Sequence, residues 1–422
     1  MRLWQNSNMF KLLHFLIIVS LLTGCSATVE SRLDSIRGDY MNTSVNADDL
    51  ESKNNLDLLI TADALFHSDD ISGADNAYEI FNRKNPGVAD GGDILREAAS
   101  FTFGANVNDY KPYMMDSLFV SYYQLWAALI DGRYDDARVI INQSYSRQTD
   151  MSRAYEKLIE SNQKSFAENT GLTTDLRNEN SKWTAYRDIM NPALMYLSGL
   201  YFLNTGDFNN AKTYLSRANG MVPKNSFIVK DLKNAEFGTT PKNTVWVFIE
   251  DGFAPKLTEQ RISLPILHGN GLTTVTIAIS EPVFSNNTVH IDDAQELANV
   301  DAMFMTEYGE YRINDALRAF TSASARVALQ STMYNSRSDK APLLGLFSTL
   351  YSEFTNSADV RTWATLPKTI SVLRMLNNKS GLIELRSNGN LIDKVSVPTS
   401  GNYLIYVRAA PTGYDIKTIK LK

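Results

Sequence analysis

A single cysteine, Cys25, is the residue whose type and position most clearly permit covalent chemistry in this chain. It is the only cysteine among 422 residues. It follows the apolar run from Leu12 to Leu22 and the two small residues Thr23 and Gly24. Such a run holds a segment at a bilayer surface, and small side chains leave the backbone open to a membrane-embedded enzyme. The pattern therefore indicates a secretory signal whose cleavage site lies just before Cys25.

The stretch Leu22-Thr23-Gly24-Cys25 resembles the lipobox of bacterial lipoproteins. That resemblance implies a diacylglyceryl thioether on Cys25, palmitate among the acyl chains, and removal of residues 1–24 as a signal peptide. Two or more acyl chains bind a membrane stably, whereas one binds marginally. In the same pattern Ser26, in place of Asp, implies transfer to the outer membrane, facing the periplasm.

Two other interpretations compete with the lipid anchor. A transmembrane helix needs roughly 20 apolar residues, whereas the uninterrupted run here fits the roughly 7–15 residues of a secretory signal. Cys25 could also be an incidental buried thiol. If Cys25 is acylated, no disulfide can form within the chain, and packed cores must stabilise the exported protein.

The charge of the chain argues against nucleic acid and anionic lipid headgroups as partners. Arg2 and Lys11 leave with the signal peptide, so the 41 basic side chains fall to 39 against 47 acidic ones. Both kinds of partner call for basic patches. About 400 mature residues exceed one ordinary core and predict two or three domains.

Residues 55–238 show the helical period. Asn191-Pro192 is a helix start signal, a turn follows at Asn204 to Asp207, and Pro223 ends the second run. The segment resembles a tetratricopeptide (TPR) repeat, whose small residues, aromatics and proline fall here at Gly199, Phe202, Gly206, Phe208, Ala211, Ala218 and Pro223. We expect Gly199 and Ala211 to let two helices approach closely.

Two weaker copies of this pattern precede it. Residues 122–141 repeat the turn as Asp131 to Ala137, and residues 55–81 offer a third copy after a turn at Asp70 to Gly73. The copies do not follow one another at the motif's period of about 34 residues. We therefore expect an irregular TPR-like array, with a generic α-hairpin domain as the alternative.

The period changes in the second half of the chain. Val245 to Ile249 is a short β-rich run before a turn signal at Glu250-Asp251-Gly252, and residues 261–267 and 274–279 predict further strands. Two amphipathic helical runs follow as an insert at residues 311–356. Strand-like runs separated by Gly- and Asn-rich turns then predict a small antiparallel β-sandwich or meander at residues 367–422.

The predicted fold class is α+β multidomain, a TPR-like α-helical array followed by a β-rich region. The expected units are a polar tether at 25–54, a helical domain at 55–238, a β-rich domain at 241–366, and the C-terminal unit at 367–422. Thr239-Thr240-Pro241 is the expected junction of two separable halves, because the residue before a proline is pushed out of the helical region.

The whole mature chain resembles a family of uncharacterised bacterial outer-membrane lipoproteins. The resemblance rests on the TPR-like half, the segment from Val245 to Pro265, and the segment from Ala358 to Pro367. It implies architecture and location, and genes that lie near those of lipoproteins that activate peptidoglycan synthases. It brings no activity and no catalytic residue.

Residues that support metal or nucleophilic chemistry lack the necessary spacing. His67, His268 and His290 show no metal-ligand pattern, so we expect no metal and no cofactor. His67 beside Asp69 and Asp70 is typical of a solvated turn. Gly-x-Ser-x-Gly and P-loop motifs are absent from the sequence.

Two pairs of acids could cut a glycan between them, Glu250 with Asp251 and Glu307 with Glu310. The alternative is that they are ordinary turn or surface acids. Arg361 and Trp363 near a domain junction could serve a ligand, or Trp363 packs while Arg361 caps or pairs.

Two further groups could face a peptide groove on the helical array. They are the acidic pair Asp135-Asp136 and the aromatic cluster of Tyr122, Tyr123 and Trp126, although aromatic residues on such helices more often form the core.

The leading hypothesis is a non-enzymatic adaptor or scaffold, anchored by lipid at Cys25, that binds an envelope protein through the TPR-like surface. The alternatives are an envelope enzyme that acts on peptidoglycan or glycan with acids of the β half, and a structural subunit of an envelope complex.

Overall fold

The computed structural model describes residues 25–41, 45, 47–86, 110–167, 190–268, 271–286, 288–312, 358–377 and 381–421. The predicted signal peptide lies outside the described residues, and so does the predicted helical insert apart from residues 311 and 312. No helix in the described ranges is both long and apolar enough to cross a membrane.

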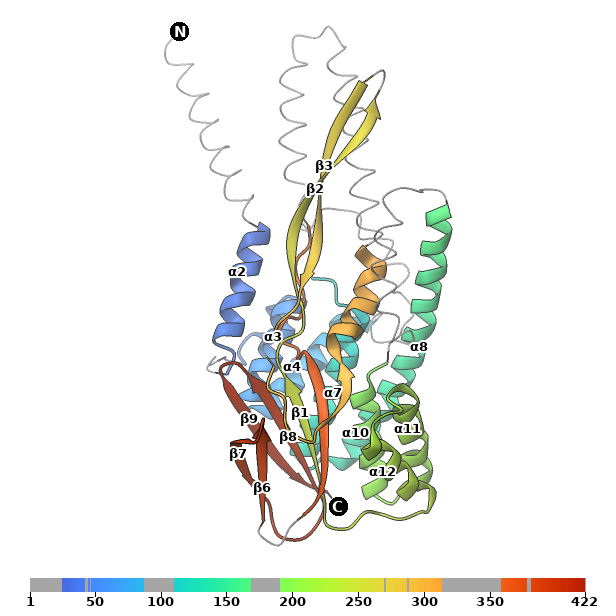
Figure 1. Ribbon diagram of the computed structural model, residues 1–422, viewed down its shortest axis with the longest axis vertical. Coiled ribbons are helices and arrows are strands. Elements are labelled where there is room, and N and C mark those ends of the chain that lie inside the picture. Colours follow the sequence, from blue (N-terminus) through green and yellow to red (C-terminus); the bar gives the residue numbers. More distant parts are fainter. Residues whose placement is uncertain are drawn as a thin grey trace.

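The helices that the structure describes lie mainly in the first half of the chain (Figure 1). Their bounds are α2 Cys25–Gly38, η1 Leu50–Ser52, α3 Asn55–His67, α4 Ile71–Lys84, α7 Met114–Ile130, α8 Tyr134–Ala167, α10 Pro192–Asn204, α11 Phe208–Met221 and α12 Ser226–Glu236. A further helix begins at Val300 and is described as far as Arg312.

Three helical hairpins, α3–α4, α7–α8 and α10–α11, share one turn geometry. A residue with positive φ ends each first helix: Asp69 at 66°, Gly132 at 67° and Gly206 at 79°. In each hairpin the next amide donates back to the last helical turn, as from Asp207 N to Phe202 O at 3.0 Å. The third copy turns at Asp69 rather than at residues 70–73, because Asp70 caps α4 by accepting from the Gly73 amide.

Close packing of α10 on α11 confirms the prediction made from Gly199. A Cβ added to Gly199 would lie only 2.6 Å from Leu215 Cγ. Ala211 is fully buried, and Phe202 stacks on Tyr214 with ring centroids 5.4 Å apart. The small side chain at Gly199 therefore sets the distance between the two helices.

The strands confirm the α+β class. A five-stranded sheet has the order β4-β5-β1-β8-β9, and β2–β3 and β6–β7 form two-stranded ribbons. The bounds are β1 Thr244–Asp251, β2 Lys256–His268, β3 Gly271–Val283, β4 Gln295–Asn299, β5 Thr369–Leu376, β6 Leu382–Ser387, β7 Asn390–Ser396, β8 Tyr403–Ala410 and β9 Gly413–Lys420.

Strand β1 lies in the middle of the sheet and pairs with β5 antiparallel and with β8 parallel. Strands from the predicted C-terminal unit thus share a sheet with β1 and β4, and only β6–β7 forms a ribbon apart from it. All eight residues of β1 are buried. Such a strand needs a neighbour on both edges and a cover on both faces.

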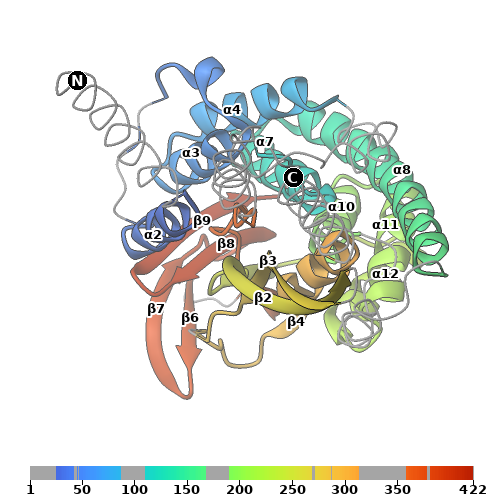
Figure 2. The same ribbon diagram turned by 90° about the horizontal axis from the view of Figure 1, so that it is seen from above.

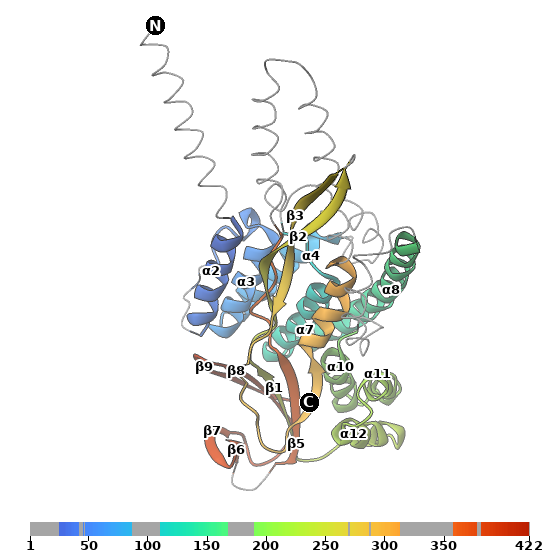
Figure 3. The ribbon, with the colours of Figure 1, turned by 45° about the horizontal axis from the view of Figure 1, so that its top comes forward.

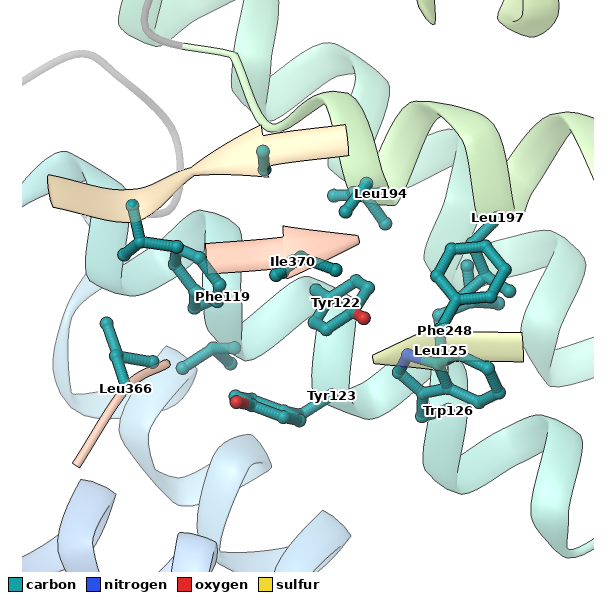
Figure 4. Close-up of a cluster of buried hydrophobic side chains, with 14 of the residues drawn as sticks. Phe119, Tyr122, Tyr123, Leu125, Trp126, Leu194, Leu197, Phe248, Leu366 and Ile370 are labelled. Carbon is teal, nitrogen blue, oxygen red and sulfur yellow. The ribbon is translucent and has the colours of Figure 1, made fainter. Parts of the chain in front are cut away.

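The two faces of β1 pack against different parts of the chain. Trp246 and Phe248 join the helical core, where Phe248 meets Trp126 at a centroid distance of 5.3 Å (Figure 4). Val245, Val247 and Ile249 pack with residues of β6 and β7 on the opposite face. One core thus contains residues from both sides of the expected junction at 239–241.

The helices form an arc, and the sheet lies inside it (Figure 2). Helices α7 and α10 are buried along their length, whereas α4, α8 and α11 keep an exposed face. The inner face of the helical array is therefore occupied by the sheet of the same chain.

The expected tether is instead a helix that docks on the body. Leu33 in α2 is 2% exposed, and Arg37 donates to the carbonyl oxygens of Ala364 at 2.8 Å and Ala254 at 2.5 Å. Asp34 pairs with Lys256 at 2.6 Å. This segment was predicted to be a tether because most side chains of α2 are polar and exposed, and few of them face the body.

Candidate functional site

A polar cluster lies buried between α3, α7 and the sheet. We call it the Glu250 cluster, and its members are Tyr40, Asp63, His67, Tyr123, Glu250, Tyr406 and Arg408. The parallel register of β1 and β8 places Glu250 beside Arg408. Positions 246, 248 and 250 of β1 alternate toward the helices, so a carboxyl group ends an otherwise apolar series.

Glu250 is fully buried and lies between two tyrosines. Its Oε2 accepts hydrogen bonds from the hydroxyls of Tyr123 and Tyr406, each at 2.9 Å. Burial raises the pKa of Glu250 above its ordinary value, while Arg408 and the two tyrosines oppose that shift. The expected turn at residues 250–252 begins later, because β1 continues to Asp251 and Gly252 has a φ of 64°.

Arg408 is also fully buried. Its guanidinium group donates to the carbonyl oxygens of Ala409 at 2.8 Å and Thr365 at 3.2 Å. The same group lies 5.1 Å from the ring centroids of both Tyr40 and Phe253, within the range of a cation–π contact. Arg408 was not predicted from the sequence, although a charged residue at the end of an apolar strand was the available signal.

His67 links the buried Glu250 cluster to charged residues nearer the surface. Its Nδ1 lies 2.8 Å from Asp415 Oδ2, and its Nε2 lies 3.8 Å from Asp63 Oδ1. Lys417 bridges Asp415 at 3.0 Å and Asp69 at 2.5 Å, and Asp69 is exposed. The prediction of a solvated turn at His67 is wrong, because its side chain lies in the last turn of α3 under β9 and is only 3% exposed.

Several buried polar atoms of this region have no hydrogen bond of ordinary geometry from the described residues. They include Oε1 of Glu250, Nε of Arg408 and the hydroxyl of Tyr78. Each such group costs about 1–3 kcal/mol relative to a paired one. Buried ionisable groups with shifted pKa values gather at functional sites, so the Glu250 cluster is the candidate functional site.

A second buried cluster, the Asp231 cluster, connects helices to strands and has a different character. Asp231 of α12 accepts from Tyr196 and from the Trp246 indole, each at 2.7 Å, and from Arg374 Nε at 2.9 Å. These three partners belong to α10, β1 and β5. Burial raises the pKa of Asp231, and Arg374 opposes the shift. Both carboxylate oxygens are thus used in a structural junction.

The interpretation of the two predicted acid pairs as ordinary surface acids is wrong for Glu250, Asp251 and Glu307, which are buried. Glu250 and Asp251 are consecutive on β1, and the Asp251 oxygens accept from the Val289 amide at 2.8 Å. Glu307 is buried and accepts from two amides at the start of α7, while Glu310 is half-buried.

Glu307 has an acidic neighbour that the sequence did not suggest. Burial raises its pKa to about 8, although the amides of Met114 and Met115 lower it. Asp116 contributes to that rise, and burial raises the pKa of Asp116 itself to about 7. The two carboxyl groups therefore cap the first turn of α7 as groups that titrate near neutral pH.

The other predicted ligand residues divide between core and surface. Trp363 is buried, with its ring centroid 6.0 Å from that of Tyr123. Arg361 pairs with Asp359 at 2.7 Å and lines a pocket of about 90 Å³ between α2 and α3, next to the ion pair of Arg32 and Asp57. The interpretation that Trp363 packs and Arg361 pairs is confirmed.

The aromatic cluster predicted for a groove belongs to the core. Tyr122, Tyr123 and Trp126 are fully buried against the sheet (Figure 4). Their groove interpretation is wrong because the sheet occupies the inner face of the array. Asp135 and Asp136 are exposed at the start of α8, where Asp136 pairs with Arg133 at 3.1 Å.

Cys25 is the first residue of α2, and its lipidation stays a prediction. His290 is exposed and His268 ends β2. Within the ranges that the structure describes, no three His, Cys, Asp or Glu side chains group as a metal site would require.

Comparison with known proteins does not extend this picture. No family model, no curated protein and no solved structure matches the chain. The resemblance to outer-membrane lipoproteins therefore stays a prediction from the sequence.

Proposed function

We propose that the protein is a non-enzymatic adaptor of the bacterial cell envelope, held at the periplasmic side of the outer membrane by lipid on Cys25. The observation that carries this proposal is the arrangement of the three helical hairpins. They present a continuous outer layer of α4, α8 and α11, while their inner helices pack on the sheet.

The partner surface of the adaptor is the outer helical layer. In a repeat array the concave face is the usual binding surface, but here β1 and β8 fill it. The exposed side chains of the outer layer include Val139 of α8, which is 53% exposed. Val139 offers one apolar contact position there, and the proposed partner surface is the layer as a whole.

The alternative of an envelope enzyme has less support from the geometry. Of the acids that suggested it, Glu250, Asp251 and Glu307 accept hydrogen bonds inside the core, and Glu250 lies between two tyrosines without exposure to solvent. A structural subunit of an envelope complex would use the same outer layer and differs from an adaptor only in how long the complex persists.

Photo-crosslinking in cells tests this assignment. A photoreactive amino acid at Glu79, Val139 or Lys212 samples the exposed faces of α4, α8 and α11. Matched positions on the opposite side of the molecule are Glu384 in β6 and Leu391 in β7. We expect one protein to be captured from the helical positions and not from the sheet positions. Capture from Glu384 or Leu391 alone would show that the partner binds the sheet side, and would contradict the proposed helical surface.

The anchor is tested separately by Cys25→Ala. We expect this variant to leave the membrane fraction or to keep its leader, because neither acylation nor cleavage can follow. Radiolabelled palmitate on the Cys25→Ala chain would contradict the anchor.

A further inference from the structure

The β2–β3 hairpin extends beyond the rest of the described chain at the end where α2 begins (Figures 1 and 3). Its strands pair over their full length, from Lys256 opposite Val283 to His268 opposite Gly271. A two-stranded ribbon that leaves the body needs a second surface to contact, because a lone hairpin is marginally stable in water.

Contacts between α2 and β2 set the alignment of these two elements, and the alignment determines how far the hairpin extends past Cys25. Asp34 pairs with Lys256 at 2.6 Å, and Glu30 accepts from the Glu259 amide at 3.0 Å. Toward its start, α2 therefore runs alongside β2 in the direction of the hairpin tip.

From Glu30 back to Cys25 the helix rises about 8 Å. From Glu259 forward to His268 the strand advances about 30 Å. The tip thus lies about 20 Å beyond Cys25 along this direction.

The projecting part carries no charge. Residues 262–280 contain no Asp, Glu, Lys or Arg. Charged residues resume at the base, where Arg261 pairs with Glu259 at 3.1 Å and Glu281 pairs with Arg312. In the register of the hairpin, Leu264 lies opposite Val275 and Leu267 opposite Leu272. A charge-free segment of this kind, flanked by ion pairs, suits transfer from water to an apolar phase.

We propose that the tip of the β2–β3 hairpin inserts into the lipid bilayer to which Cys25 anchors the chain. The proposal rests on the lipid anchor proposed above, because a thioether on Cys25 places the start of α2 at the membrane surface. With α2 docked on β2, little free chain separates that surface from the body. The hairpin then reaches the bilayer before any other described strand does.

The insertion is partial rather than spanning, because a reach of about 20 Å is less than the roughly 30 Å of hydrocarbon in a bilayer. The two strands of a ribbon cannot pair the backbone groups of their outer edges with each other, and such groups are costly in hydrocarbon. The Ser263 and Thr276 hydroxyls, 3.0 Å apart across the ribbon, add polar groups below the tip. The described strand ends, which include Leu267 and Leu272, therefore enter the bilayer, while Ser263 and Thr276 stay at the interface.

A fluorophore at the tip tests the proposal on the lipidated protein in phosphatidylcholine vesicles. Because the lipid occupies Cys25, a cysteine introduced by Leu267→Cys is the only free thiol and accepts a single environment-sensitive label. The matched control is Tyr414→Cys on β9, where the native side chain is 42% exposed. We expect the tip label to emit at shorter wavelength and to lose most of its emission when the vesicles carry nitroxide-labelled lipid. The control label should show neither change.

Every other result contradicts insertion of the hairpin into the bilayer. A blue shift without nitroxide quenching means that protein covers the tip, and no shift means that it stays in water. Leu272→Asp, opposite the label in the register, should abolish quenching while the protein still floats with the vesicles and melts unchanged. A protein that fails to float overturns the anchor at Cys25, and with it the hairpin proposal. A protein that floats with an unquenched tip overturns the hairpin alone.

Discussion

The Asp231 cluster and the Glu250 cluster both bury a carboxyl group and an arginine between the helices and the sheet, yet they differ in hydrogen bonding. Both Asp231 oxygens accept, from Tyr196, Trp246 and Arg374. In the Glu250 cluster Arg408 donates to backbone carbonyls instead, and one Glu250 oxygen accepts no hydrogen bond of ordinary geometry from the described residues.

This difference separates a structural role from a candidate functional one. A buried ion pair with all its hydrogen bonds fixes one arrangement of the elements that it joins, and removing one partner is costly. Buried polar groups that are left unpaired instead destabilise the fold. The comparison therefore predicts unequal responses to substitution.

The largest effect is expected at Arg374. Arg374→Ala leaves the carboxyl group of Asp231 buried without its cation, at a cost of about 3–5 kcal/mol in the free energy of unfolding. Urea unfolding followed by circular dichroism measures the loss. The control is Arg386→Ala on β6, which breaks an exposed pair with Glu384 and should cost about 0–1 kcal/mol. Equal losses of unfolding free energy in the two variants would contradict a structural role for the Asp231 cluster.

A pH dependence of stability is expected from Glu307. Its folded pKa of about 8 lies above the ordinary value of 4.5, so the folded chain keeps a proton that the unfolded chain releases. Stability should therefore fall as the pH rises from about 5 to about 8, and be fully present below the unfolded pKa. Glu307→Gln should flatten this slope in melting curves recorded across that range. A slope that is unchanged in the variant would assign the dependence to other groups, with Asp116 as the first to examine.

A smaller effect is expected at the contact between α10 and α11. Gly199→Ala places a methyl group against Leu215 and should cost about 1–3 kcal/mol through overpacking. Gly220→Ala in α11 is the matched control, because nothing lies within 4 Å of its added Cβ, and it should stabilise by up to about 1 kcal/mol. Thermal melting distinguishes the two signs. Stabilisation by both variants would mean that the helices are not closely packed there.

The smallest effect is expected at Glu250. Glu250→Gln keeps the volume and can still accept from Tyr123 and Tyr406, so the loss should not exceed about 1 kcal/mol. Glu250→Leu, which cannot accept, serves as the comparison. If Glu250→Gln costs as much as Arg374→Ala, the Glu250 cluster is as structural as the Asp231 cluster, and the distinction between them fails.

The sequence predicted those features of the fold that arise from local patterns. The start at Asn191-Pro192, the turn at Gly206, and the close approach at Gly199 follow from residue types within one turn of helix. The α+β class follows from the change of period. These signals are readable because helix caps and turns are stabilised by neighbours in the sequence.

Pairing between distant segments was not readable in the same way. The parallel pair of β1 and β8 joins residues about 160 positions apart, from Val245 opposite Tyr403 to Asp251 opposite Ala409. No periodicity reports such a partner, because alternation gives the face of a strand and not its neighbour. For this reason His67 was predicted in a solvated turn and Arg408 was not singled out, since their burial depends on β9 and on the side chains of Tyr40 and Phe253.

The docking of α2 has a mechanical consequence. A lipoprotein on a loose linker can rotate freely at its membrane, and a pull on the lipid first extends the linker. Here Arg37 ties α2 to the carbonyls of Ala254, which follows β1, and of Ala364, which precedes β5. Force applied at Cys25 would pass through these two hydrogen bonds and the ion pair of Asp34 with Lys256 directly into the core. With lipid on Cys25 as proposed, tilting of the anchored end would be transmitted to the core and not absorbed by a linker.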